Sequence, residues 1–118
     1  MASHEMKTKI AGVTFPDPAS GLNRQEVIGR FVRPGTRLEL RLESNEHAEG
    51  NVAVGIWLKR GCVRRQEFHV GYLNEQRKRE FQPALARGVK YTAAVLDVTG
   101  GTKQEPTRGV NVVIRWRD

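Results

Sequence analysis

The sequence predicts a mainly β protein: a small OB-like or SH3-like antiparallel barrel of about six strands, with one or two short helices. Three observations lead to this prediction. Apolar and charged residues alternate in short segments, most clearly in Arg37–Glu43, as in a strand with one buried face. Glycine and proline turn signals separate the segments. No segment has the long apolar run of a parallel strand buried on both faces.

The 118 residues have the size of a single domain. We expect the barrel to span residues 7–118 and residues 1–6 to be a disordered start or a remnant of cloning. The longest apolar runs fall far short of the roughly 20 residues that a membrane span needs. No secretory signal is visible, and one cysteine cannot form an internal disulfide. We therefore expect a cytoplasmic protein with no membrane partner.

The first half of the chain predicts a strand, a helix and a second strand. Lys7–Phe15 alternates loosely between polar and apolar residues. Asn23–Phe31 places its apolar residues on one helical face and begins with a residue that can cap a helix. Arg37–Glu43 follows a Pro-Gly turn signal and has leucines on one face and charges on the other.

The second half predicts four strands and a helix. The strands are expected at Asn51–Leu58, Gln66–Leu73, Val89–Thr99 and Gly109–Trp116. The first two flank Arg60-Gly61-Cys62, which is typical of a hairpin tip. Asn74 can cap a helix over Glu75–Phe81, and Pro83 should end or kink that helix.

Positive charge is concentrated in the second half. Residues 1–50 contain 7 Lys and Arg and 7 Asp and Glu, whereas residues 51–118 contain 13 and 6 and hold the whole net charge of +7. Clustered positive charge attracts polyanions, of which nucleic acid is the commonest. A basic surface that only aids solubility is the alternative. The candidate phosphate-binding residues are Lys59, Arg60, Arg64, Arg65 and Arg77.

The sequence lacks the common enzyme motifs: the phosphate-binding GxxxxGK[ST] loop, HExxH, GxSxG and GxGxxG are all absent. The three histidines and Cys62 do not have metal-ligand spacing. The remaining catalytic option is a nucleophile pair of Cys62 and His69. We favour the alternative, in which His69 is a strand residue whose ring is either hydrogen-bonded within the protein or exposed. We expect a protein without catalytic activity or cofactor.

Two aromatic residues are candidates to stack on unpaired bases, a contact that contributes about 1–3 kcal/mol per base. Phe15 ends the first predicted strand, and a core position is its alternative. Tyr72 lies beside Gly71 at a junction between a strand and a helix, which predicts partial exposure. Trp57 and Trp116 lie in apolar strand segments and are expected in the core.

Several short motifs occur in a fixed order between residues 7 and 101. They are Gly12-Val13-Thr14-Phe15, Asn23-Arg24-Gln25, Pro34-Gly35, Glu43-x-Asn45, Asn51, Gly71-Tyr72-Leu73 and Gly88. In this order the set resembles the HIRAN domain, of the stand-alone bacterial or phage type. The resemblance implies a non-catalytic OB-like barrel that binds single-stranded DNA, with a pocket for a free 3′-hydroxyl end.

The resemblance also implies roles for individual residues. Phe15 falls where an aromatic residue stacks on the terminal base. Tyr72 falls at a pocket position that relatives fill with histidine or an aromatic residue. Asn51 matches a loop asparagine that can brace the loop through side-chain to backbone bonds.

Three positions near the implied pocket depart from the family pattern. Thr14 stands where the DNA-end binder has an arginine for phosphate. Ala48 removes a second stacking ring, for which His47 is the available substitute. Glu49 replaces an aspartate that accepts a hydrogen bond from the 3′-hydroxyl, and the basic clusters could offset the lost phosphate contact.

The first functional hypothesis is a non-enzymatic module that binds single-stranded DNA, with 3′-hydroxyl ends as the narrower target. It would act in DNA repair or at stalled replication forks, alongside an SNF2-type helicase or a nuclease. The second hypothesis is a protein-interaction or regulatory module that recruits a repair or phage partner. RNA binding is a third, since stacking and phosphate contacts do not read the sugar. An enzyme is the fourth.

Overall fold

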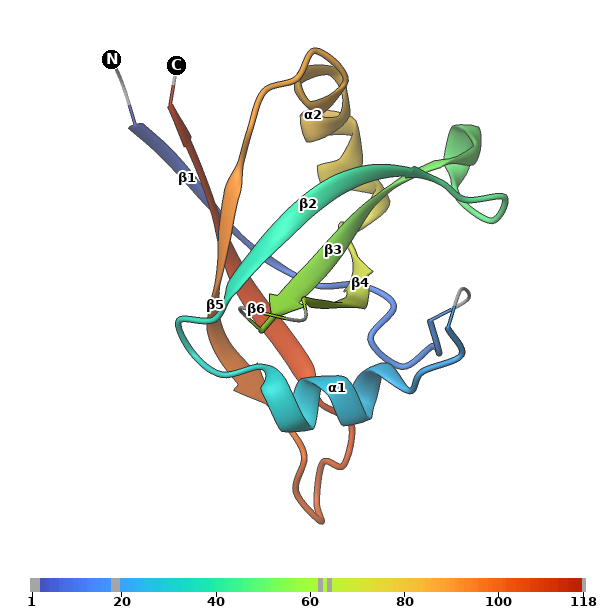
Figure 1. The fold of residues 1–118 in the computed structure, drawn as a ribbon, viewed down its shortest axis with the longest axis vertical. Coiled ribbons are helices and arrows are strands. Elements are labelled where there is room, and N and C mark those ends of the chain that lie inside the picture. Colours follow the sequence, from blue (N-terminus) through green and yellow to red (C-terminus); the bar gives the residue numbers. More distant parts are fainter. Residues whose placement is uncertain (1–2, 18–19, 62, 64, 118) are drawn as a thin grey trace.

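The computed structural model describes residues 3–17, 20–61, 63 and 65–117, and its strands form one six-stranded antiparallel sheet. The elements are β1 (Ser3–Lys9), α1 (Arg24–Phe31), β2 (Arg37–Ser44), the 3₁₀ turn η1 (Glu49–Asn51), β3 (Val52–Arg60), β4 (Gln66–Tyr72), α2 (Glu75–Ala86), β5 (Thr92–Thr99) and β6 (Gly109–Arg117). The strand order is β1-β6-β5-β2-β3-β4 (Figure 1). The predicted mainly β fold with two helices is confirmed.

The two edges of this sheet meet, which gives the fold its barrel-like form. The chain continues beyond β1 to Ala11, which pairs with Tyr72 at the end of β4. The amide of Ala11 donates to the carbonyl of Tyr72 at 2.8 Å, and the amide of Tyr72 donates to the carbonyl of Ala11 at 2.9 Å. This pairing satisfies backbone groups that an open edge would leave without a partner.

The core lies inside the curved sheet and is mainly aliphatic. The alternation in β2 turns Leu38 and Leu40 inward, and β3 and β6 add further fully buried side chains such as Ile56 and Ile114. Burying each such side chain stabilises the fold by roughly 1.5–3 kcal/mol. The two helices lie at opposite ends of the barrel in Figure 1, and each contributes a buried residue, Ile28 from α1 and Phe81 from α2.

The outer face of β2, β3 and β4 is polar and aromatic. Residues that alternate with the buried leucines of β2 point to this face, among them Arg41 and Glu43. The register places Trp57 of β3 opposite both Glu39 of β2 and His69 of β4. This outer face forms one wall of the candidate site.

The first strand begins earlier than the sequence predicts. Lys7–Phe15 was the expected strand, but β1 ends at Lys9, and the expected disordered start is wrong from Ser3 onward. Ser3 to Lys9 pair in unbroken register with β6. The local pattern there is weak, with one strongly apolar residue, Met6, so pairing with the open edge of β6 decides the structure. Met1 and Ala2 lie outside the described residues.

The second helix does not end at Pro83. It continues to Ala86, because proline removes only one backbone donor and the last turn retains its other hydrogen bonds. The amide of Arg87 bonds to the carbonyl of Ala84 at 3.1 Å, and Leu85 packs against the core. In the part of the chain that the structure describes, no helix is both long enough and apolar enough to span a membrane.

Candidate binding pocket

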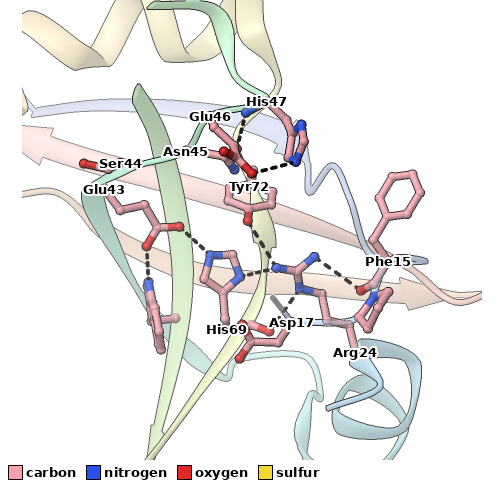
Figure 2. Close-up of a pocket in the computed structure, with 12 residues that line it drawn as sticks. Phe15, Asp17, Arg24, Glu43, Ser44, Asn45, Glu46, His47, His69 and Tyr72 are labelled. Carbon is pink, nitrogen blue, oxygen red and sulfur yellow. Dashed lines mark hydrogen bonds and ion pairs between the residues drawn. The ribbon is translucent and has the colours of Figure 1, made fainter. Parts of the chain in front are cut away.

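A cavity of about 640 Å³ lies against the outer face of β2, β3 and β4. Three parts of the chain supply its walls: residues 15–17 after β1, residues 43–47 at and beyond the end of β2, and the side chains of Arg24, Trp57, His69 and Tyr72. Figure 2 shows these groups converging on one space. Its size is within the range of pockets that hold small organic groups.

The buried guanidinium of Arg24 ties the walls of the pocket together. Arg24 is the first residue of α1 and is only 1% exposed. Its Nε donates to the His69 carbonyl at 3.3 Å. Nη1 donates to the carbonyls of Gly12 and Phe15, at 3.2 and 3.3 Å. Nη2 donates to Nδ1 of His69 at 2.8 Å and to the Tyr72 hydroxyl at 3.4 Å. Arginine has five N–H groups, so all of them are used. The loop that carries Phe15 is thereby fixed to β4.

The hydrogen bonds of Arg24 fix the tautomer of His69. A guanidinium only donates, so Nδ1 of His69 must accept and Nε2 must carry the hydrogen. Nε2 then donates to Oε1 of Glu43 at 2.6 Å. The other carboxylate oxygen, Oε2, accepts from Nε1 of Trp57 at 3.2 Å. His69 is therefore satisfied at both nitrogens, as the sequence analysis favours.

The two aromatic candidates both line the pocket. Phe15 is 66% exposed, so a core position for it is wrong. Its ring points away from Arg24 while its carbonyl oxygen accepts from that guanidinium (Figure 2). Tyr72 is half-buried, which confirms its predicted partial exposure. Its ring lies 4.6 Å from the His69 ring and 5.0 Å from the Arg24 guanidinium.

Trp57 is not in the core, contrary to the prediction. Ile56 and Leu58 on either side of it point inward, so Trp57 points to the outer face and is half-buried there. The guanidinium of Arg41 covers its ring at 4.8 Å. Trp116 is also only partly buried, although it packs against the core. Alternation along β3, rather than the apolar character of the segment, decides where Trp57 lies.

The loop residues that the HIRAN resemblance singles out are not all brought to the pocket. His47 lines it with an exposed ring, whereas Thr14, Glu49 and Asn51 do not. Glu49 and Asn51 belong to η1, where Asn51 has a positive φ of 60°. Glu49 pairs with Arg79 at 2.6 Å, and this guanidinium lowers the pKa of the Glu49 carboxyl.

The basic candidates that the structure describes lie away from the pocket lining, and most of them have partners. Lys59 pairs with Glu39 at 3.0 Å, Arg77 pairs with Glu80 at 3.1 Å, and the guanidinium of Arg60 lies 3.9 Å from the Phe31 ring. Arg65 is exposed. Arg64 and Cys62 are outside the described residues. A ring of cations around the pocket is thus not seen among the residues that the structure describes.

Four pocket residues were not predicted from the sequence: Arg24, Glu43, His69 and Trp57. Arg24 and Glu43 occur in the quoted motifs, and strict alternation already placed Glu43 on the polar face of its strand. The missing information was the pairing of Trp57 with His69 across β3 and β4. A β-bulge beside Trp57 shifts the register of this strand pair, and no local pattern in the sequence predicts it.

Comparisons of this chain with protein-family models, characterised proteins and solved structures find no match. The similarity to the HIRAN domain therefore stays a prediction from the sequence. Within the described residues, no group of three or more His, Cys, Asp or Glu is arranged to hold a metal ion.

Proposed function

We propose that this chain is a non-enzymatic module that binds single-stranded DNA by taking an unpaired nucleobase into the pocket beside Phe15. The observation that carries the proposal is the exposed ring of Phe15 at the edge of an aromatic cavity. A large apolar side chain held at the surface beside a cavity is typical of a binding site. Every nucleobase has a flat face on which such a ring can stack.

The rest of the pocket supports a base as the occupant. His47 and Tyr72 offer two further rings on its walls, and the cavity of about 640 Å³ has room for one base. Arg24 holds the backbone of Phe15, so the ring is presented by a fixed loop and stacking loses little conformational entropy. This arrangement favours binding without a large rearrangement.

The pocket suits a strand that ends in a free 3′-hydroxyl better than a strand that ends in a 3′-phosphate. The described lining contains the carboxylates of Asp17, Glu43 and Glu46. A terminal hydroxyl can donate to a carboxylate, whereas a terminal phosphate would bring negative charge toward all three. The phosphates of the rest of the strand would be attracted by the net charge of +7 of the whole chain.

Replacing Phe15 with alanine tests the stacking contact. We expect Phe15→Ala to weaken binding of a short single strand by about 1–3 kcal/mol, since it removes one base-stacking ring. Fluorescence anisotropy should be measured for strands ending in a 3′-hydroxyl or a 3′-phosphate and for a blunt duplex, at two salt concentrations. Leu22→Ala is the matched control, because Leu22 is exposed but does not line the pocket.

Unchanged affinity in a folded Phe15→Ala protein would contradict the stacking role. Equal weak binding to all three nucleic acids would remove end recognition and leave only charge attraction. An RNA strand of the same sequence shows whether the sugar is read.

A protein-interaction module is the second candidate, and the charge of the pocket favours it. Three carboxylates beside aromatic rings can also hold a lysine or arginine side chain of a partner. Ion pairing of Lys59 and Arg77 leaves fewer basic groups for phosphate. Pull-down with and without nuclease separates the two candidates, because a DNA-mediated interaction is lost on digestion.

A further inference from the structure

The strong hydrogen-bond donors that α1, β3 and β4 turn toward the pocket are used within the protein. Arg24 is the only lysine or arginine among the described residues that line it, and all of its N–H groups bond to protein acceptors. Nε2 of His69 and Nε1 of Trp57 both donate to Glu43. A ligand therefore meets none of these strong donors.

Acceptors remain accessible. The Glu46 side chain is 86% exposed, and its contact with Nε2 of His47 is long, at 3.4 Å. The Glu43 carboxylate is partly exposed, and each of its oxygens has a second lone pair beyond the bond it already accepts. The pocket thus offers carboxylate oxygens to groups that carry hydrogen.

The hydrogen bonds of Arg24 also orient one donor in the pocket, the hydroxyl of Tyr72. The hydroxyl oxygen of Tyr72 accepts from Arg24 at 3.4 Å, which leaves its own hydrogen for another acceptor. The pocket therefore combines carboxylate acceptors with a Tyr72 hydroxyl donor that Arg24 holds in place. A ligand edge with an amino group beside an unprotonated ring nitrogen complements this set.

We infer that the pocket prefers cytosine and adenine to thymine and uracil, an inference that rests on the proposed function. Cytosine and adenine each present an exocyclic amino group next to a ring nitrogen that accepts. Thymine and uracil present a carbonyl oxygen where cytosine has the amino group, and this oxygen would face carboxylates. Carboxylate side chains accept from the cytosine amino group in protein–DNA complexes as well.

Matched strands of deoxycytidine and deoxyuridine test the inference, because the two bases have the same ring size and similar stacking surfaces. We expect the full chain to bind the deoxycytidine strand at least about fivefold more tightly, the low end of base discrimination by a good contact. Both strands have the same phosphates, so the ratio should hold at two salt concentrations even as both affinities fall. Fluorescence anisotropy gives both dissociation constants.

Glu46→Gln tests the carboxylate in the same assay. The exposed side chain keeps its size and loses its charge, and the preference for deoxycytidine should shrink by at least half. Glu105→Gln is the matched control, because it makes the same charge change in an exposed loop away from the pocket and should keep the full ratio. Tyr72→Phe, which removes only the hydroxyl, should lower the ratio as well.

A ratio within about twofold, or tighter binding of deoxyuridine, overturns the inference. If Phe15→Ala still weakens binding of both strands in that case, the proposed function stands and only the base preference fails. If Phe15→Ala weakens binding of neither strand, both the base preference and the proposed function are overturned.

Discussion

Arg24 shows how one side chain can organise a site that it does not offer to a ligand. Its guanidinium is buried, and it bonds to the loop after β1, to the backbone and ring of His69, and to Tyr72. A buried cation is stable only when its donors find acceptors, and here they do. The carbonyl of Phe15 is one of those acceptors, so the backbone that carries its exposed ring is fixed.

Replacing Arg24 with lysine should destabilise the protein although the charge is kept. Lysine has three donors on a flexible stem and cannot reproduce the planar fork, so at least two acceptors lose their partner. We expect a loss of about 1–3 kcal/mol in the free energy of unfolding, measured by urea titration. Arg30→Lys, on the exposed side of the same helix, is the control and should change little. Equal urea midpoints for Arg24→Lys and Arg30→Lys would show that the hydrogen bonds of Arg24 are dispensable for stability.

At the scale of elements, ion pairs on the outer face join β2, β3 and β4. Arg41 of β2 pairs with Glu67 of β4 at 3.0 Å and with Glu39 on its own strand at 3.2 Å, while Lys59 of β3 reaches Glu39 at 3.0 Å. Hydrogen bonds from Arg41 lower the pKa of the Glu39 and Glu67 carboxyls, and Lys59 lowers that of Glu39 further. The carboxylates in turn raise the pKa of Arg41.

These shifts give a signed dependence of stability on pH. A carboxyl whose pKa is lower in the folded state stabilises the fold above its ordinary value of 4.5, and this contribution is lost as the pH falls through the folded pKa. We expect the free energy of unfolding to fall between pH 5 and pH 3, and to fall less steeply in Arg41→Met. Thermal unfolding across this pH range measures both slopes.

The control for this pH dependence is Arg115→Met, which removes an exposed pair with Glu5 at 3.3 Å on the other side of the barrel. It should keep the wild-type slope. Because these are surface pairs, added salt should reduce the difference between Arg41→Met and the wild type. Parallel pH curves for wild type and Arg41→Met would contradict the assignment.

A second link between elements holds the loop that carries His47. Lys78 of α2 is buried, and its Nζ donates to the carbonyls of Glu49 and Val52 at 2.7 and 2.8 Å and pairs with Glu75 at 2.6 Å. The lysine thus satisfies carbonyls at both ends of η1. Helix α2, which begins after the Asn74 cap, therefore also anchors the loop that forms the His47 wall of the pocket.

At the scale of the whole molecule, closure of the barrel depends on a glycine. Gly71 has a φ of 153°, and a side chain there would meet Ile10 and the carbonyl oxygen of Ala11. Ala11 is the residue that joins the two edges of the sheet by pairing with Tyr72. The close approach of two backbones, rather than a tight turn, explains the glycine at this position.

Gly71→Ala should therefore open the seam of the barrel. We expect a loss on the order of 2–4 kcal/mol in the free energy of unfolding, since the new methyl group collides with backbone that cannot move freely. Gly88→Ala is the matched control: its φ is 87° but the added atom meets nothing within 4 Å, so it should cost about 1 kcal/mol. Urea unfolding gives both values.

Amide hydrogen exchange then locates the effect of Gly71→Ala. Protection at the amides of Ala11 and Tyr72 should fall in this variant and persist in Gly88→Ala. A Gly71→Ala protein that keeps both its stability and this protection would rule out the seam as the reason for the glycine.

The local patterns of the sequence determined most of the elements and the fold class of this protein. Strict alternation in Arg37–Glu43 fixed a strand and its two faces, and Asn23 and Asn74 marked the starts of both helices, where their side chains accept backbone hydrogen bonds. Partial exposure of Tyr72 also followed from its place at a junction. Each of these features depends on neighbours within a few residues.

The tertiary structure alone decided which side chains form the pocket. Arg24 and His69 are 45 residues apart, and Glu43 and His69 are 26 apart, yet each pair is joined by a hydrogen bond. Their contacts follow from strand register and from the packing of α1 against β4, which no local pattern encodes. For the same reason the described members of the basic clusters, Lys59, Arg60, Arg65 and Arg77, lie apart from the pocket lining. Charge along a chain does not specify where its segments meet.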